Sequence, residues 1–502
     1  MTEQIQSEKR AKAAPPAGGN TRPNILVILT DQQRKDSIGC YGNDTICTPN
    51  IDAIARSGVA FQNAYVANPI CMPSRLSLFT GKNIRNHGLW TNGLHLDEQP
   101  TIMSELTKSG YQTASIGKIH FTPFNTKSNY ESIPYWEDRK QDVAWNGPYW
   151  GFEHVELTIH HTKTLAHYGK WFYENGGTDQ MQAVDKKTGI RPDLPSSLHD
   201  SAFIADRTIQ YLKNVRDKNK PFFLTASFPD PHLPFDPPGD IAKKYSPQDV
   251  TLPKGSREGL ADRPDHYLRH FRGGWHRKGN IPEKHPDGLS ETVIRQRIAN
   301  TSAMVDLIDQ NIGKILQELE NQQLTDNTII IFTTDHGELM GDYGLWNKGP
   351  FYFQSLINIP FIMSVPGGVK NVTTDALFSH IDLVPTLCDL IGHPTELRPN
   401  GISQKDILLG RKKNIRDHCL VEYRNGYGEN DMSSKALVTQ DWKYVYYQNN
   451  DEELTDLAND TDEAVNLAGD PACTEVKEEM RLRLLQEVLS TEQKSPEQTV
   501  NA

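Results

Sequence analysis

The chain has 502 residues and a formal net charge of -11, from 53 basic and 64 acidic side chains. This length predicts one large domain with a smaller one rather than a single ordinary core. The acidic balance and the lack of a long basic run argue against nucleic acid as a partner. An anionic ligand would need a site that is locally positive against this field.

The first residues of the chain, 1–21, are polar and contain Ala, Pro and Gly, which predicts a disordered tail. They hold no apolar core of a signal peptide, and no run of about 18 apolar residues follows, so we expect no membrane span and a cytoplasmic protein. The pattern leaves the oligomeric state open. Six cysteines are scattered along the chain, which is not a disulfide framework: Cys40, Cys47, Cys71, Cys388, Cys419 and Cys473.

Short apolar runs alternate with amphipathic segments from residue 25 onward. Runs of this kind predict buried strands at 25–29, 113–116, 221–227, 328–333 and 360–364. Helical spacing or helix-ending glycines predict helices at 49–58, 101–109, 200–215 and 302–319. This alternation indicates an α/β fold with a large, mainly parallel central sheet flanked by helices.

The pattern changes after about residue 396. A hairpin is predicted from 436–439 and 442–447, and a last helix from 475–488. We therefore expect a catalytic α/β domain over 22–395 and a smaller α+β subdomain over 396–502. Two irregular stretches, 125–195 and 239–286, are expected to be long loops that wall a pocket.

Polar side chains follow several predicted strands at the point where each strand ends. Because ligands bind beyond the carboxyl ends of parallel strands, we expect these side chains to gather at one edge of the sheet. They are Asp31, Lys118, His120, His232, Asp335 and His336.

The sharpest motif is Cys71-Met-Pro-Ser-Arg75, followed by Thr80-Gly81. Pro73 predicts the start of a helix, because proline is favoured in the first turn. The Cys71 side chain would then face the positive end of that helix, which suits an anionic nucleophile or substrate group.

This motif resembles the signature of the formylglycine-dependent sulfatases of the alkaline phosphatase superfamily, and the resemblance extends from residue 24 to about 466. In that family an oxygen-using or anaerobic maturase oxidises the cysteine to formylglycine. The resemblance implies an alkaline phosphatase-like fold and hydrolysis of sulfate monoesters, with formylglycine at position 71 as nucleophile.

Asp31-Gln32 and Asp335-His336 resemble the two metal-binding pairs of that family. Oxygen-rich ligation with one nitrogen suits a hard divalent cation, Ca²⁺ first and Mg²⁺ or Mn²⁺ next. Gln32 and His336 depart from the common Asp and Asn, and such departures also occur in the related phosphonate monoester hydrolases.

Two further elements resemble family motifs. In Gly117-Lys118-Ile119-His120, the resemblance implies that Lys118 holds a sulfate oxygen. His120 would contact the formylglycine hydroxyl and act as the base that expels sulfate. In Pro231-His232-Leu233-Pro234, His232 would donate a proton to the leaving alcohol.

The remaining candidates are basic or line the same region. Arg75 and Lys348 would stabilise the sulfuryl oxygens together with Lys118 and the cation. His87 and Asn92 fall in a stretch that lines such sites in the family.

Two other functions stay open. A phosphonate monoester or phosphate diester hydrolase on the same scaffold fits Gln32 and His336, whereas Lys118 with His120 favours a sulfatase. A non-catalytic binder of sulfated ligands would need no nucleophile at Cys71. The expected substrates are small-molecule or saccharide sulfate esters.

Overall fold

Eight strands form the central sheet, in the order β4-β3-β5-β1-β6-β7-β2-β8. The computed structural model describes residues 22–127, 129–139, 143–159, 163–271, 289–425 and 431–492, so the predicted tail over 1–21 lies outside the described residues. The strand bounds are β1 Asn24–Thr30, β2 Val59–Tyr65, β3 Gln112–Gly117, β4 His154–Leu157, β5 Phe222–Ser227, β6 Thr328–Thr334, β7 Asn358–Ser364 and β8 Val372–Ser379.

The sheet is mostly parallel, and this confirms the predicted fold class. β1 pairs in parallel with both β5 and β6, so the carboxyl ends of these strands lie at one edge. The exception is β7, which is antiparallel to β6 and to β2. All five predicted strands are present, whereas β2, β4 and β8 were not predicted.

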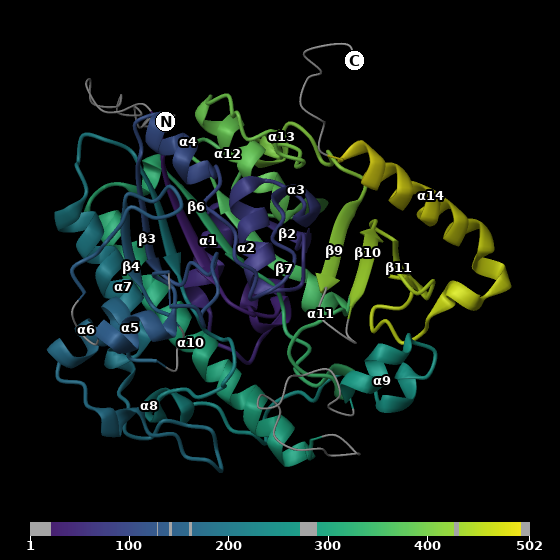
Figure 1. Cartoon of the computed structure of the whole chain (residues 1–502), viewed down its shortest axis with the longest axis horizontal. Helices are drawn as coiled ribbons and strands as arrows, with labels where there is room; N and C mark the ends of the chain where they lie inside the picture. Colours follow the sequence, from purple (N-terminus) through teal and green to yellow (C-terminus); the bar gives the residue numbers. More distant parts are fainter. Residues whose placement is uncertain are drawn as a thin grey trace, which may run out of the picture.

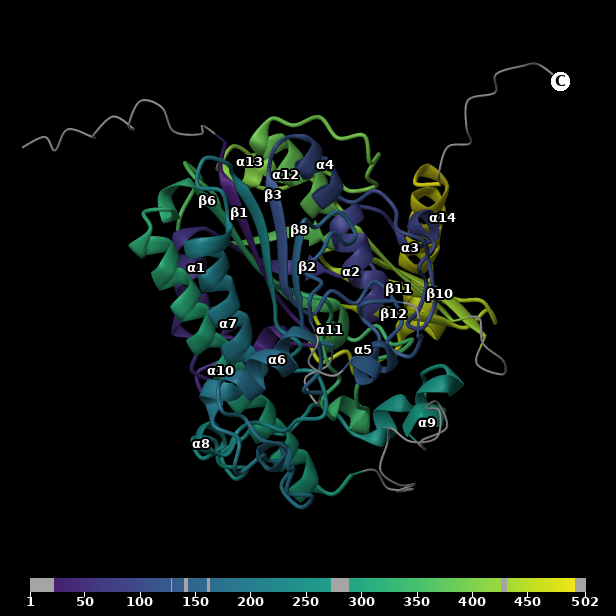
Figure 2. The same cartoon turned by 60° about the vertical axis from the view of Figure 1, so that its left-hand side comes forward.

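Helices cover both faces of the sheet (Figures 1 and 2). Leu26 and Ile28 of β1 pack in the cluster shared with α1, α7 and α10, whereas Ile25 and Val27 face the cluster shared with α2 and α12. This alternation explains why β1 is apolar throughout. The helices of these two layers are α1 Pro49–Ser57, α7 Asp200–Gln210, α10 Glu291–Asn321, α2 Cys71–Thr80, α3 Ile84–His87, α4 Ile102–Lys108, α12 Leu383–Ile391 and α13 Lys405–Leu408.

Helix α10 begins at Glu291 and not near residue 302 as predicted. Its first turns are mostly polar and half-exposed, and their apolar residues Ile294 and Ile298 are only partly buried against a small cluster, so the core-facing pattern is weak there. The predicted helix over 200–215 is α-helical only to Gln210 and continues as a π-helical turn, Tyr211–Val215.

The irregular stretches are not only loops in the described ranges. They contain α5 Ile133–Arg139, β4 and α6 Ala166–Glu174 in the first stretch, and α8 Gly239–Ala242 and α9 Asp265–Phe271 in the second. The loop prediction was therefore wrong for these segments, whose helices are too short to show a clear sequence period. Residues 272–288 lie outside the description.

A smaller antiparallel sheet follows the central one along the chain, in the order β12-β11-β10-β9. The helix α14 Thr474–Ser490 packs on it through Met480 and Leu484, which confirms a C-terminal α+β subdomain. The strands are β9 Cys419–Asn425, β10 Met432–Val438, β11 Trp442–Tyr447 and β12 Glu452–Asp456. Across the described ranges, every helix is too short or too polar to span a bilayer.

Candidate active site

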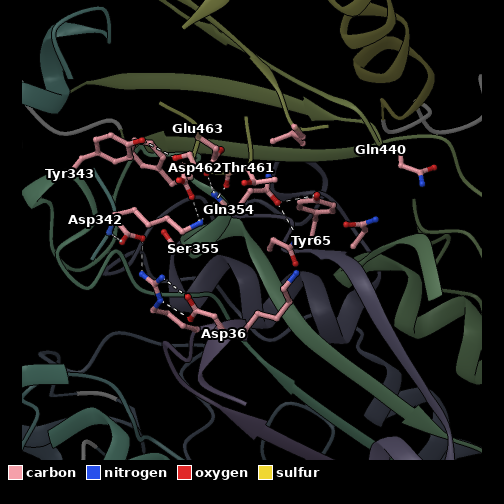
Figure 3. A pocket seen from close by; sticks show the side chains of 17 residues that line it. Asp36, Tyr65, Asp342, Tyr343, Gln354, Ser355, Gln440, Thr461, Asp462 and Glu463 are labelled. Carbon is pink, nitrogen blue, oxygen red and sulfur yellow. Dashed lines mark hydrogen bonds and ion pairs between the residues drawn. The ribbon is translucent and has the colours of Figure 1, made fainter. Parts of the chain in front are cut away.

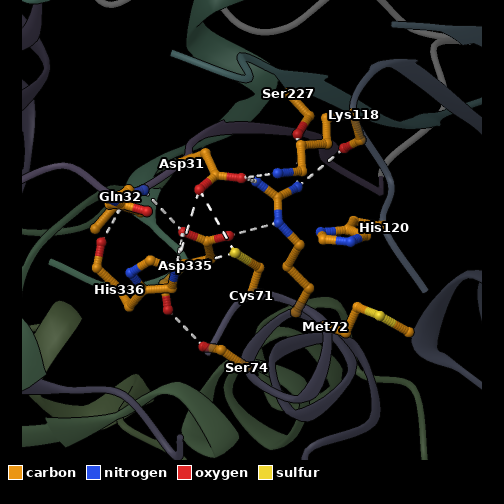
Figure 4. A network of polar contacts seen from close by, with 12 residues as sticks. Asp31, Gln32, Cys71, Met72, Ser74, Lys118, His120, Ser227, Asp335 and His336 are labelled. Carbon is orange, nitrogen blue, oxygen red and sulfur yellow. Dashed lines mark hydrogen bonds and ion pairs between the residues drawn. The ribbon is translucent and has the colours of Figure 1, made fainter. Parts of the chain in front are cut away.

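The carboxyl edge of the central sheet brings most of the predicted side chains together (Figure 4). β1, β3 and β6 end at the residues that precede the acidic, basic and imidazole groups, and α2 enters the same region. These side chains are almost completely buried: Asp31, Gln32, Cys71, Arg75, Lys118, His120, Asp335 and His336. The strand-end prediction was therefore right about where these groups lie.

Cys71 is the first residue of α2 and Pro73 the third, so Pro73 lies in the first turn as predicted. Ile70 is extended, and its carbonyl accepts the first helical hydrogen bond from Ser74 N at 3.0 Å. The Asn92 side-chain oxygen accepts a hydrogen bond from the Met72 backbone N–H at 3.0 Å. The nucleophile candidate thus lies in the first turn of the helix, where backbone N–H groups point outward.

The Cys71 sulfur lies among charged groups. Lys348 Nζ is 2.7 Å from Cys71 Sγ, His336 Nε2 is 3.1 Å away and Asp31 Oδ1 is 3.8 Å away. Burial and Asp31 raise the pKa of the Cys71 thiol, but Lys348, His336 and Lys118 outweigh them and lower it.

The four predicted metal ligands, Asp31, Gln32, Asp335 and His336, lie around this sulfur. His336 Nε2 lies 3.6 Å from Asp335 Oδ1 and 4.0 Å from Asp31 Oδ1, and the Gln32 backbone N–H donates to Asp335 Oδ1 at 3.0 Å. The donor atoms of Asp31, Cys71, Asp335 and His336 all lie within 4.8 Å of one another. Lys348 Nζ donates to Gln32 Oε1 at 2.7 Å. Two buried carboxylates with an amide and an imidazole fit a divalent cation.

The Arg75 guanidinium contacts both carboxylates of the site, Asp31 and Asp335. Its Nε donates to Asp335 Oδ2 at 2.7 Å, and its Nη2 lies 3.4 Å from Asp31 Oδ2. Its Nη1 donates to Ser227 Oγ and to the Lys118 carbonyl, each at 3.0 Å. The guanidinium is fully buried, so its bonds give it a bracing role that the sequence did not predict.

Lys118 and His120 follow the carboxyl end of β3. Lys118 Nζ forms an ion pair with the Asp31 carboxylate. His120 has a positive φ of 60° and stacks on Phe124 with ring centroids 4.0 Å apart. Its backbone N–H donates to the Glu131 carboxylate. Among the described residues His120 Nδ1 has no hydrogen-bond partner, and burial with Lys118 holds its pKa well below the usual range, so the imidazole is neutral.

His232 lies in the loop after β5, and its ring is half-buried. Its Nδ1–H donates to the Leu233 carbonyl at 2.6 Å, which leaves Nε2 as the second ring nitrogen. Burial raises the pKa of Asp31, but Lys118, His232, Lys348 and Arg75 lower it well below its usual value. His232 thus contributes, with the two lysines and Arg75, to the positive field at Asp31.

Sequence reasoning missed the role of Glu338, although its Asp-His-Gly-Glu motif was visible. Its carboxylate is fully buried and accepts hydrogen bonds from the Gln32 side chain and from the backbone N–H groups of Met340 and Asn347. Burial raises the pKa of Glu338 despite these bonds. The Glu338 carboxylate thus orients the Gln32 amide so that the amide oxygen faces Lys348.

His87 does not join this cluster. Its Nε2 lies 2.9 Å from Ser77 Oγ on α2, and its Nδ1 accepts from the Leu89 N–H at 3.1 Å. Burial lowers its pKa to about 3, so it is a neutral residue of the α2–α3 packing.

A separate cavity of about 290 Å³ lies between the central sheet and the C-terminal subdomain (Figure 3). Its lining contains none of the predicted site residues. Side chains that line it include Arg34, Lys35, Tyr65, Tyr343, Gln354 and Glu463.

An alkaline phosphatase-like sheet whose carboxyl edge gathers a buried cysteine and a group of side chains that could hold a metal ion fits the class of metal-dependent ester hydrolases. The chain belongs to the sulfatase family: the model described as Sulfatase matches residues 23–393. A second model, for the C-terminal part of N-sulphoglucosamine sulphohydrolase, matches residues 341–490. Membership identifies a sulfuric ester hydrolase and disfavours the non-catalytic binder.

Relatives agree with this assignment. An arylsulfatase of Clostridium perfringens is 30% identical over 490 residues, covering 94% of this chain and 95% of the relative. An N-acetylglucosamine-6-O-sulfatase of Bacteroides thetaiotaomicron is 27% identical, with 93% and 86% covered. The solved phosphonate monoester hydrolase of Agrobacterium radiobacter has a TM-score of 0.78 at 25% identity, covering 94% of this chain and 96% of that one.

Proposed function

We propose that this sulfatase hydrolyses sulfate monoesters to an alcohol and inorganic sulfate with formylglycine made from Cys71 as its nucleophile. The main support for this proposal is the position of the Cys71 sulfur. It lies in the first turn of α2, 2.7 Å from Lys348 Nζ and beside the Asp31 and His336 donor atoms. The producing cell must then supply a maturase.

A hard divalent cation is proposed for the cluster of Asp31, Gln32, Asp335 and His336, because three of the four donors are oxygens. Ca²⁺ fits first, and the single imidazole donor keeps Mg²⁺ and Mn²⁺ as alternatives. When bound, the cation supplies positive charge beside the sulfuryl group.

The hydrated aldehyde of formylglycine supplies one hydroxyl to attack sulfur and a second to expel sulfate. Lys348 and Lys118 place ammonium groups where negative charge grows on the sulfuryl oxygens. His232 is proposed to donate a proton to the leaving alcohol, and His120 to accept the proton of the second hydroxyl. The neutral state of His120 suits this acceptor role.

Local charge also supports an anionic substrate. Arg75 and Lys118 pair with the two carboxylates Asp31 and Asp335, and Lys348 adds a third positive charge beside Cys71. A divalent cation would add to this excess. The site is thus positive inside a protein whose net charge is -11.

A phosphonate monoester or phosphate diester hydrolase remains the second candidate. Gln32 and His336 in the donor set favour it, and so does the similarity to the Agrobacterium radiobacter enzyme. Lys118 and His120 beside Asp31 favour the sulfatase.

For the substrate class we propose sulfated saccharides or small sulfate esters. The support is the name of the Bacteroides thetaiotaomicron relative, an N-acetylglucosamine-6-O-sulfatase. A cytoplasmic protein would act on small imported esters rather than on polymers.

The test is to produce the protein with a formylglycine-generating enzyme and to measure inorganic sulfate released from an aryl sulfate. We expect turnover in the wild type, the mass of formylglycine at position 71, and no turnover in Cys71→Ala. Turnover by a protein whose residue 71 is still a thiol would refute the nucleophile assignment.

A further inference from the structure

The first turns of α10 reach past the carboxyl edge of the sheet (Figures 1 and 2). The helix starts at Glu291 after the capping residue Ser290, whose side chain accepts from Val293 N. Further along, Asn300 Nδ2 donates to the Phe235 carbonyl at 2.8 Å. This face of α10 therefore packs on the loop that carries His232.

The same face also packs on the loop that carries Lys348. Met304 forms an apolar cluster with Phe235, Met340 and Trp346. Trp346 precedes Lys348 by two residues, and Phe235 follows His232 by three. One face of α10 thus supports the loops of two proposed catalytic groups, one of them the proton donor to the leaving alcohol.

Arg297 lies on this face, one turn before Asn300. Its guanidinium carbon is 4.8 Å from the centroid of the Trp346 ring. Within the described ranges its guanidinium forms no hydrogen bond and no ion pair, although the residue is half-buried. Its neighbour Arg295 differs, because it pairs with Glu291 at 2.7 Å and donates to the Val250 carbonyl.

The charge of Arg297 is incompletely compensated. Burial lowers the pKa of its guanidinium, and Glu338 is the acidic group that raises it. Glu338 is bonded to Gln32 and to two backbone N–H groups and makes no ion pair with Arg297. Contact with the Trp346 ring offsets part of the desolvation, and the guanidinium N–H groups, which keep some contact with solvent, make no hydrogen bond to the described part of the chain.

Building on the proposed sulfatase function, we propose that Arg297 binds a second anionic group on the leaving-group side of the substrate. The preferred substrate is then a sulfate ester whose alcohol part also carries a carboxylate or a second sulfate. A guanidinium presents paired N–H donors that match the two oxygens of such a group. Arg297 is a specificity residue in this proposal and takes no part in the sulfuryl transfer.

The test compares phenyl sulfate with 2-, 3- and 4-carboxyphenyl sulfate in the matured enzyme, so that the second anion is offered at three distances. We expect the wild type to have the higher kcat/KM for at least one carboxylated ester. In Arg297→Ala we expect that kcat/KM to fall by about 10- to 100-fold, the range for a charge-assisted hydrogen-bonded pair. Phenyl sulfate should change by less than about threefold.

Arg295→Ala is the matched control, since it removes an arginine that already has partners on the same helix. It should leave the ratio between the two classes of ester unchanged, and Arg297→Lys should retain part of the preference. Melting temperatures report whether each variant folds. The proposal is overturned if no carboxylated ester is preferred, or if Arg297→Ala slows both classes equally. An inactive wild type on phenyl sulfate would instead count against the proposed function.

Discussion

Two buried ionic networks in this protein are built differently. Under the C-terminal sheet, Arg263 pairs with Glu453 and Lys443 with Glu463, and all four side chains are at most 4% exposed. At the carboxyl edge, Arg75 and Lys118 share Asp31, and Arg75 also pairs with Asp335. A third cation, Lys348, donates to Gln32 and Cys71 instead. In the C-terminal network each charge is neutralised by one partner, so these pairs stabilise the fold. At the carboxyl edge the charges are shared and unequal in number, so these groups can still bind a cation and an anionic substrate.

The largest effect should follow from breaking the catalytic cluster at Lys348. Lys348→Met removes the ammonium that lies 2.7 Å from Cys71 Sγ, so sulfate hydrolysis should fall by about 10²- to 10³-fold. Steady-state kinetics of the matured enzyme measure this. A loss below about tenfold, with normal conversion of Cys71, would contradict the role of Lys348.

Removing one carboxylate of the cluster should release the cation. Asp335→Asn loses a donor that also binds Arg75, so the purified variant should contain less divalent metal and little activity. Metal content per chain is the readout, with Asp326→Asn as the control because that side chain is exposed. Equal metal content in both variants would place the cation elsewhere.

The C-terminal network should respond in the opposite way. Lys443→Met leaves Glu463 buried without its partner, so the free energy of unfolding should fall by about 3–5 kcal/mol. The kcat of the folded enzyme should stay unchanged. Urea unfolding followed by kinetics tests both, and a lower kcat with unchanged stability would show that the two networks do not divide their roles as described.

The smallest effect is expected at a third ion pair, outside both networks. Burial raises the pKa of Glu156 on β4, but His154 and Arg207 lower it to about 2. Because the folded pKa lies below the unfolded value, the stabilisation is present above about pH 4.5 and is lost as the pH falls toward 2. Glu156→Gln should remove about 1 kcal/mol of this pH dependence. Unfolding at a series of acidic pH values measures it, and identical slopes in both proteins would contradict it.

Sequence patterns predicted the parts of this protein that rest on local rules. Continuous apolar runs gave β1 and β6, and the polar residues after them placed Asp31 and Asp335 at one edge. β2 was missed because it contains Gln62 and Asn63 at an irregular register. Such a strand is specified by its neighbours and not by its own period.

Long-range contacts account for what was missed in the site. Arg75 lies in a recognisable motif, but its four acceptors lie at the carboxyl ends of β1, β3, β5 and β6, so its bracing role is visible only in three dimensions. The same holds for Glu338, whose partners include the side chain of Gln32. The start of α10, with Arg297, is mostly polar, and Ile294 and Ile298 alone give only a weak helical period in the sequence.

The most direct test of the sulfatase assignment compares esters that share one leaving group. An aryl sulfate, an aryl phosphonate monoester and an aryl phosphate diester would be given to the matured enzyme, with Cys71→Ala as the blank. We predict that kcat/KM is highest for the sulfate and that all turnover disappears in Cys71→Ala. Faster hydrolysis of the phosphonate or the diester would contradict the assignment and would direct attention to Gln32 and His336.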